Sequence, residues 1–390
     1  LQYNDIAAMS RLHRRAAARM TRPAISIRNE GSWTFGSPSV LMMFYRAPGE
    51  LQSELQEMDE CMPHYYKITN GHGQGAETIM RAEADFMRAC FADAQIMLER
   101  AYAQIDGNGQ ENMALCCDFL AWRLSLCTSF TPRESFEQRR EALLQQHNVA
   151  WLNILQSSCA YYYALLGLPE KIPAVFREHQ LASIHFLAPG KPMMELIENQ
   201  VYLAQGEYAK VIGHSEALLG MCEAMHYALV ALHIRLQTAA AYEMLGKRET
   251  ADELLISALA AAEPDALYLP FVENYRYLKT ALTRGAGAKF AAFVRTVTPL
   301  GEDFVRRCGE KRAEGSRPAA LAGLTERESA IAALVAKRLS NREIAEQLFL
   351  SEGSVKQYIN QIYSKLLITG DVRTLSLIHI SEPTRLGMIS

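Results

Sequence analysis

Apolar side chains recur along residues 1 to about 300 at steps of three and four positions. This spacing puts them on one face of a helix, whereas the alternating pattern of a half-buried strand is scarce. Two turn-rich segments interrupt the pattern, GSWTFGSPS at 31–39 and NGHGQG at 70–75. The pattern therefore predicts an almost wholly helical structure for this part of the chain.

A repeat is visible within this helical part. Gly167, Gly206 and Gly246 each follow a short run of aromatic and aliphatic residues, at intervals of 39 and 40 residues. Two periods before Gly167 the chain reaches Ala89, which lies between two segments of the same character, whereas the intermediate position near Thr128 is less regular. A small residue is expected at these positions because the chain must reverse between two packed helices.

A period near 40 residues with two helices per unit is typical of an α-solenoid, in which stacked hairpins share one core. The repeats resemble the tetratricopeptide class, although they exceed its usual length of about 34 residues and keep only part of its consensus. We therefore expect an all-α chain with a tetratricopeptide-like α-solenoid over residues 1–308. The alternative is an irregular helical bundle whose spacings agree by chance.

Small and polar residues over 309–323 predict a linker. Beyond it, Thr325 and Glu328 have the spacing of a capping box, which Ser340 and Glu343 repeat. Each pair predicts the start of a short helix.

A third short helix is expected after Ser351, which can cap it. The residues expected to face inward from the three helices are Ile331, Leu334, Val335, Ile344, Ala345, Leu348, Val355, Ile359, Ile362 and Leu366. Three short helices with a tight turn before the last predict a small helix-turn-helix DNA-binding domain over residues 324–374.

The third of these helices leaves a polar face outward, formed by Glu352, Ser354, Lys356, Gln357 and Asn360. Lysine can meet phosphate or guanine, and glutamine and asparagine can pair with adenine edges, so this face suits a major groove. The alternative is an ordinary solvated helix face. Charge does not separate the two, because residues 324–374 hold seven Lys or Arg and six Asp or Glu.

Sequence similarity favours the first interpretation. The strings LTERE at 324–328 and LSNREIAEQLFLSEGSVKQYINQIYSKL at 339–366 closely resemble the LuxR-type helix-turn-helix of bacterial regulators. The resemblance implies that the groove-facing part of the third helix includes Ser354, Val355, Lys356 and Tyr358. It also implies that the phosphates lie near Asn341, Arg342 and Lys365.

This sequence departs from the LuxR-type pattern at three positions. Arg338 stands where glycine is usual, Tyr358 replaces a common histidine, and Gly353 weakens the first turn of the third helix. These departures bear on the DNA site that is read and leave the assignment intact.

The helical part has a resemblance of its own. NEGSWTFGSPSVL at 29–41 and MDECMPHYYKITNGHGQGAE at 58–77 are similar to the effector region of large LuxR-family activators related to the maltose-regulon activator. The resemblance implies a solenoid between an upstream ATP-binding domain and a DNA-binding tail. Because the chain holds no phosphate loop of the form GxxxxGK[ST], we expect no cofactor in it and ATP binding upstream of Leu1.

The last residues do not fit this family. Residues 375–390, LSLIHISEPTRLGMIS, contain Pro383 and Gly387 and lack an amphipathic period, where the family has a fourth helix that pairs two modules. The string resembles a translated sequencing adapter. We therefore expect a foreign or disordered tail and impaired self-association through the DNA-binding domain; the alternative is a natural frayed terminus.

Composition narrows the function further. Apolar residues make up 49% and the net charge is −3, which is typical of a globular protein without a general attraction to polyanions. The chain has no uninterrupted apolar run long enough for a membrane span, and its eight cysteines lack chelating pairs, which indicates buried thiols and a cytoplasmic protein.

We expect a transcriptional regulator and not an enzyme: promoter DNA would bind the C-terminal domain, and a small-molecule or protein effector would bind the solenoid. The alternative is a solenoid adaptor for a protein partner, with a passive C-terminal module. An enzyme is disfavoured because the ten histidines are scattered and no catalytic set can be grouped. A receiver domain is disfavoured because strand–helix alternation is absent.

Overall fold

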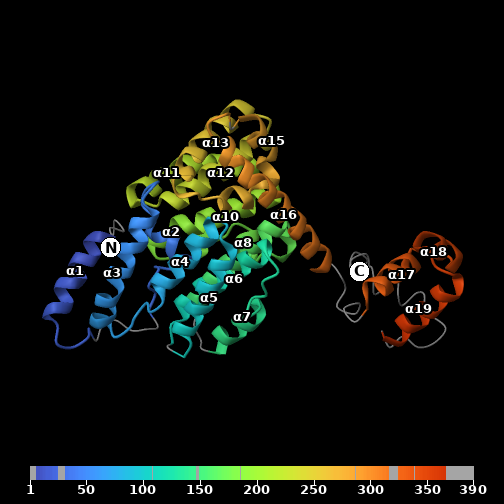
Figure 1. Cartoon of the computed structure of the whole chain (residues 1–390), viewed down its shortest axis with the longest axis horizontal. Helices are drawn as coiled ribbons and strands as arrows, with labels where there is room; N and C mark the ends of the chain where they lie inside the picture. The colour runs from blue at the N-terminus through green and yellow to red at the C-terminus, as the bar shows by residue number, and fades with distance from the viewer. Residues whose placement is uncertain are drawn as a thin grey trace. The chain divides into compact units, whose positions relative to one another are not determined.

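The computed structural model describes residues 6–24, 31–107, 109–145, 149–184, 186–285, 287–315, 324–337 and 339–365. These residues form helices joined by turns, with no strand among them, so the all-α prediction is confirmed (Figure 1). The chain divides into two compact units, Leu1–Gly309 and Glu310–Ser390. No described helix is both long and apolar enough to cross a membrane.

In the part of the first unit that the structure describes there are sixteen α-helices, of which the last continues beyond the boundary of the unit. The first eight are α1 (Ile6–Arg19), α2 (Val40–Phe44), α3 (Leu51–Thr69), α4 (Ala76–Met87), α5 (Phe91–Ile105), α6 (Glu111–Cys127), α7 (Phe136–Gln145) and α8 (Val149–Leu166). The next eight are α9 (Ala174–Arg177), α10 (Lys191–Gln205), α11 (Tyr208–Met225), α12 (Ala228–Met244), α13 (Arg248–Ala262), α14 (Leu269–Glu273), α15 (Tyr275–Gly285) and α16 (Ala291–Gly315). Short 3-10 turns occupy Pro169–Lys171, Leu181–Ser183, Ala188–Gly190 and Glu263–Asp265.

Consecutive helices pair into hairpins that stack on one another. α4 packs on α5, α10 on α11 and α12 on α13, while α4, α6, α8, α10 and α12 form a continuous layer in chain order. This is the stacking that the repeat period predicts. Membership of the tetratricopeptide class itself stays a prediction.

The turns fall where the repeat places them. Gly167, Gly206 and Gly246 have φ of +71°, +80° and +75°, and Ala89 has φ of +60°. A left-handed residue lets the chain reverse within a few positions, which explains the small residues. Thr128 instead ends α6 in an extended conformation with φ of −137°, in keeping with the irregular repeat there.

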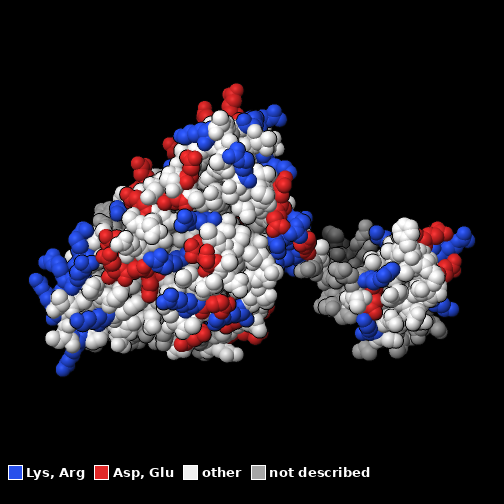
Figure 2. Space-filling view, viewed as in Figure 1, with Lys and Arg blue, Asp and Glu red and all other residues white. Residues whose placement is uncertain are grey.

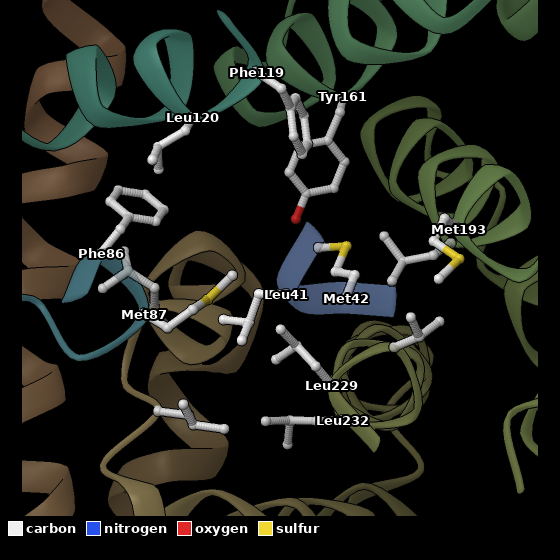
Figure 3. Packing of buried hydrophobic residues seen from close by; sticks show 14 of the residues in the cluster. Leu41, Met42, Phe86, Met87, Phe119, Leu120, Tyr161, Met193, Leu229 and Leu232 are labelled. Carbon is white, nitrogen blue, oxygen red and sulfur yellow. The ribbon is translucent and has the colours of Figure 1, made fainter. Parts of the chain in front are cut away.

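Helix α2 fills the interior of the solenoid. Leu41 and Met42 lie among side chains of the stacked layer, such as Phe86 of α4, Tyr161 of α8 and Leu229 of α12 (Figure 3). All five residues of α2 are at most 2% exposed. Its first turn is held by the backbone N–H of Leu41, which donates to the Glu83 carboxylate at 2.6 Å. The centre of the stack is therefore occupied by the protein's own chain.

Buried ion pairs tie distant helices together. The Arg123 guanidinium of α6 donates to both carboxylate oxygens of Glu273 in α14, at 2.8 and 3.1 Å, and each side chain is 1% exposed. The Tyr161 hydroxyl donates to the same carboxylate at 2.8 Å.

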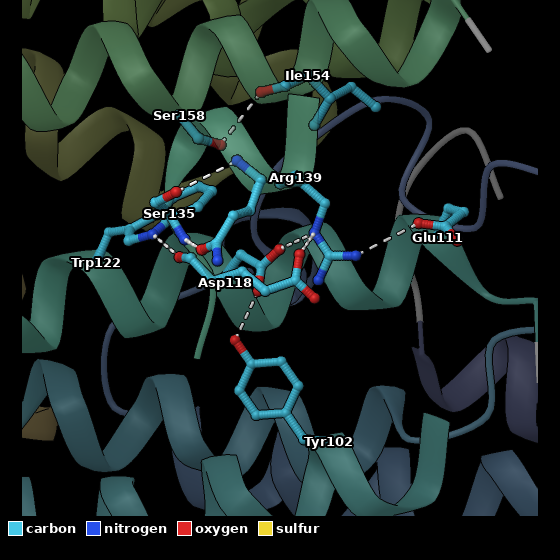
Figure 4. A network of polar contacts seen from close by, with 10 residues as sticks. Tyr102, Glu111, Asp118, Trp122, Ser135, Arg139, Ile154 and Ser158 are labelled. Atoms are coloured by element: carbon cyan, nitrogen blue, oxygen red, sulfur yellow. Dashed lines mark hydrogen bonds and ion pairs between the residues drawn. The ribbon is translucent and has the colours of Figure 1, made fainter. Parts of the chain in front are cut away.

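A second polar network joins α5, α6 and α7 (Figure 4). The Asp118 carboxylate accepts from the Tyr102 hydroxyl at 2.7 Å and from Arg139 Nε at 2.6 Å. These contacts give buried polar groups the partners that burial requires.

Two expectations need correction. The linker expected over 309–323 is helical over 309–315, because α16 continues to Gly315. Residues 310–314 all have good helix propensity, which extends the helix despite their polarity. Residues 316–323 lie outside the described part. All eight cysteines are free and six are buried, as expected, but Cys90 is exposed.

Candidate nucleic-acid interface

The described residues of the second unit form three further helices around a core of their own: α17 (Glu326–Ala336), α18 (Asn341–Leu348) and α19 (Glu352–Lys365). The buried apolar residues of this core are Leu324, Ile331, Ala332, Val335, Ile344, Ala345, Val355, Ile362 and Tyr363. Leu334, Leu348 and Ile359 pack against them while partly exposed. The inward face predicted from the sequence is therefore confirmed, except for Leu366, which lies outside the described residues.

Both capping boxes are present. The Thr325 N–H donates to the Glu328 carboxylate at 2.7 Å, and the Glu328 N–H donates to the Thr325 hydroxyl at 3.3 Å. Ser340 and Glu343 make the same two bonds at 2.7 and 3.3 Å. These contacts fix the first turns of α17 and α18.

An ion pair joins α17 to α19 in the second unit. The Lys365 ammonium at the end of α19 donates to Glu328 Oε2 at 2.7 Å, so one carboxylate serves both the cap of α17 and the contact with α19. Hydrogen bonds from Lys365 and from the Thr325 N–H lower the pKa of Glu328. The bond from the Ser340 N–H likewise lowers the pKa of Glu343.

The turn between α18 and α19 is tight. Phe349 adopts φ of +53°, and the Leu350 N–H donates to the Ala345 carbonyl at 2.9 Å. Ser351 then accepts a bond from the Ser354 N–H at 3.1 Å, which caps α19 as the sequence predicts. Buried Ala345 offers little bulk where the two helices pack. This is the geometry of a helix-turn-helix.

One face of α19 is polar and exposed. Lys356, Gln357 and Asn360 are all exposed, and their spacing of three and four residues places them on a single face. Together they offer an ammonium and two amides, which can donate to guanine O6 and N7 and pair with adenine edges. At the start of α18, Asn341 and Arg342 are also exposed, and Arg342 forms a surface pair with Glu346 at 3.2 Å.

Several predicted site residues have other roles here. Val355 is 0% exposed and packs in the core, so its assignment to the groove-facing surface is wrong. Tyr358 is half-buried against the same core. The Ser354 hydroxyl lies 2.9 Å from the Ser351 hydroxyl and is half-buried.

Lys365 also differs from its expected role, since its ammonium is engaged by Glu328 within the unit. Arg338 and residues 375–390 lie outside the described residues. For Asn341, Arg342, Lys356, Gln357 and Asn360, contact with DNA stays a prediction that their exposure permits.

Two features were not predicted. The pairing of Glu328 with Lys365 joins residues 37 positions apart and leaves no local signal in the sequence. Phe349 is 95% exposed, although a hydrophobic residue in a predicted turn would be expected to pack. Phe349 has a left-handed backbone conformation and does not belong to the apolar cluster of the described residues of this unit.

Comparison with known proteins agrees with this geometry. Residues 322–377 match the family model described as "Bacterial regulatory proteins, luxR family". The chain is similar to the "Transcriptional regulatory protein LnrK" of Bacillus subtilis (strain 168), with 41% identity over 63 residues, which is 15% of this chain and 29% of that protein. It is also similar to the "DNA-binding transcriptional activator DevR/DosR" of Mycobacterium tuberculosis (strain ATCC 25618 / H37Rv), with 39% identity over 46 residues, 12% of this chain and 21% of that protein.

The chain thus spans less than a third of the length of both relatives. No solved structure matches it. The matches identify a LuxR-family helix-turn-helix domain in the C-terminal part of the chain. The kinship of the first 300 residues with activators related to the maltose-regulon activator stays a prediction.

Proposed function

We propose that this protein is a cytoplasmic transcriptional regulator whose α19 binds in the major groove of promoter DNA. The observation that carries the proposal is the exposed face of Lys356, Gln357 and Asn360 on a capped helix within a LuxR-family domain. The opposite side of α19 is anchored by Val355 and Ile362, each 0% exposed. A rigid helix with a polar outer face suits direct readout of base edges.

Binding would have two components. Lys356, Gln357 and Asn360 would contact base edges and supply sequence preference. Asn341 and Arg342 stand in the first turn of α18, where backbone N–H groups and the helix dipole favour a phosphate. Contacts of this second kind position the protein, and their strength falls as salt concentration rises.

The first unit is the proposed effector-binding part. Because α2 fills its interior, an effector would bind at its surface. A groove of about 610 Å³ has the size of a small-molecule site and is lined by His179, Glu198 and Tyr202 among others. The His179 ring stacks on Tyr202 with centroids 4.0 Å apart, and its Nδ1 lies 3.5 Å from Glu198 Oε1. Burial raises the pKa of Glu198 to about 7.

An effector that occupies this groove should raise the melting temperature of the wild-type chain. The variant Glu198→Ala should lose most of this rise, because the side chain lines the groove. Equal rises in both proteins would place the effector elsewhere.

The DNA proposal is tested by selecting duplexes from a random pool with the full chain. We expect a recurring sequence to emerge. Lys356→Ala should weaken binding to it by about 1–3 kcal/mol and reduce discrimination among bases, whereas Arg342→Ala should weaken all duplexes alike. Failure to enrich any sequence would contradict the proposal. Retention of a protein partner by a chain without residues 321–390, in the absence of any enrichment, would favour an adaptor instead.

A further inference from the structure

We infer that the arginines of α1 form a second DNA-binding surface, which contacts the phosphate backbone without regard to sequence. The helix is anchored on one side only. Ile6, Met9 and Ala17 are buried, and α1 packs along α3. His13 Nδ1 lies 3.1 Å from the Cys61 thiol, and Lys67 Nζ donates to the Ala17 carbonyl at 2.9 Å. The side of α1 that faces α3 is therefore buried in the packing of the first unit.

The other side of α1 is strongly basic. Arg11, Arg15 and Arg19 recur every four residues, are all exposed, and span about 12 Å of helix axis. Arg14 lies beside them and Arg22 follows the helix, both exposed. The sequence of α1, IAAMSRLHRRAAAR, contains no Asp or Glu. Lys and Arg atoms gather over α1 at the left edge of Figure 2.

Among the described residues, the α3 carboxylate that pairs with an arginine of α1 offsets little of this charge. On α3, Glu60 lies 3.4 Å from Arg14, with 47% and 58% of the two side chains exposed, so water and salt screen the pair. Asp59 of α3 is paired with Arg81 of α4. The Glu54 carboxylate accepts from the Arg46 N–H at 3.0 Å. A positive surface therefore remains on the outer side of α1.

Double-stranded DNA fits this surface better than a membrane does. A duplex carries one negative charge per about 1.7 Å of axis, and guanidinium groups bind phosphate oxygens in pairs. Membrane-bound basic helices instead insert a continuous apolar face. The apolar side of α1 already packs on α3, and the large exposed apolar residues here are Leu12 of α1 and Met20, which follows the helix. The inference rests on the proposed function, which makes a duplex the partner of the same molecule.

The test compares four versions of the 390-residue chain in binding to one labelled duplex of unrelated sequence, by fluorescence anisotropy across a salt series. The wild type is compared with Arg11→Gln/Arg15→Gln/Arg19→Gln and with Arg342→Ala, which should weaken binding to any duplex. The matched control, Arg140→Gln/Arg248→Gln/Arg295→Gln, removes three exposed arginines from α7, α13 and α16. Equal circular dichroism melting curves establish that all four are folded.

Loss of three phosphate contacts should reduce the slope of log K against log salt by about 2.7. Between about 50 and 200 mM salt, the affinity of the α1 variant should therefore fall about 40-fold less than that of the wild type. The matched control should keep the wild-type slope.

Three results would overturn the inference. If the α1 variant keeps the wild-type slope while Arg342→Ala weakens binding, the inference fails and the proposed function stands. If the α1 variant and the matched control reduce the slope by the same amount, net charge explains the effect and α1 is not a DNA-binding site. If the wild type binds no duplex, the inference and the proposed function both fail.

Discussion

The first turn of α19 contains a glycine that the structure does not require. Gly353 is exposed and follows the first residue of the helix. A Cβ added at this position would meet only the Ser351 hydroxyl, at 3.8 Å, which is an ordinary contact distance. Its φ does not lie in the left-handed region. We therefore predict that Gly353→Ala stabilises the second unit.

The magnitude follows from helix propensity. In a helix interior, glycine is less favourable than alanine by about 0.8–1 kcal/mol. The difference is smaller in the first turn, so we expect the variant to be more stable by about 0.5–1 kcal/mol. For a small unit, the melting temperature should rise by about 2–8 °C.

Differential scanning calorimetry of the full chain measures the effect. A companion variant, Gly301→Ala, assigns the transitions, because its Cβ would lie 2.2 Å from Cγ of Tyr275 and should lower the melting temperature of the first unit. An unchanged or lower transition of the second unit in Gly353→Ala would refute the reasoning, since it would mean that position 353 is not helical in solution.

Two further predictions concern charged groups. Replacing Glu273 by Gln leaves the Arg123 guanidinium buried without its counter-ion. Chemical denaturation should therefore show that the free energy of unfolding of the first unit falls by about 3–5 kcal/mol. The control variant Glu302→Gln, which changes an exposed pair with Lys279, should alter this free energy little. Folding lowers the pKa values of Glu328 and Glu343 from 4.5. The stability that these carboxylates contribute is therefore complete above about pH 4.5 and is lost as the pH falls through the lowered values. In the variant Glu328→Gln/Glu343→Gln the melting temperature should depend less on pH in this acid range, and an unchanged dependence would contradict the prediction.

Local features of the fold could be predicted because each depends on residues close together in the sequence. The left-handed turns at Gly167, Gly206 and Gly246 follow from a repeat of small residues. The capping boxes that begin with Thr325 and Ser340 follow from a three-residue spacing. In such cases the backbone geometry is set within one or two helical turns.

The remaining features depend on contacts between distant segments. The run VLMMF at 40–44 does not reveal that it forms a helix at the centre of the stack, because a short apolar run fits many buried environments. The pair of Arg123 with Glu273 joins residues 150 positions apart. At the candidate site, helical periodicity predicts that Val355 is buried, whereas similarity to the family places it at the groove. The structure shows it buried, because it packs against the core of the second unit.

The outer face of α19 should touch the duplex, and photo-crosslinking measures this contact. A photoreactive side chain is placed in the 390-residue chain at Gln357 of α19 or, as a control, at exposed Ala333 of α17. Each protein is irradiated with the duplex selected by the wild type. We predict efficient crosslinking to base positions from 357 and little from 333. Crosslinking from 333 but not from 357 would contradict the account.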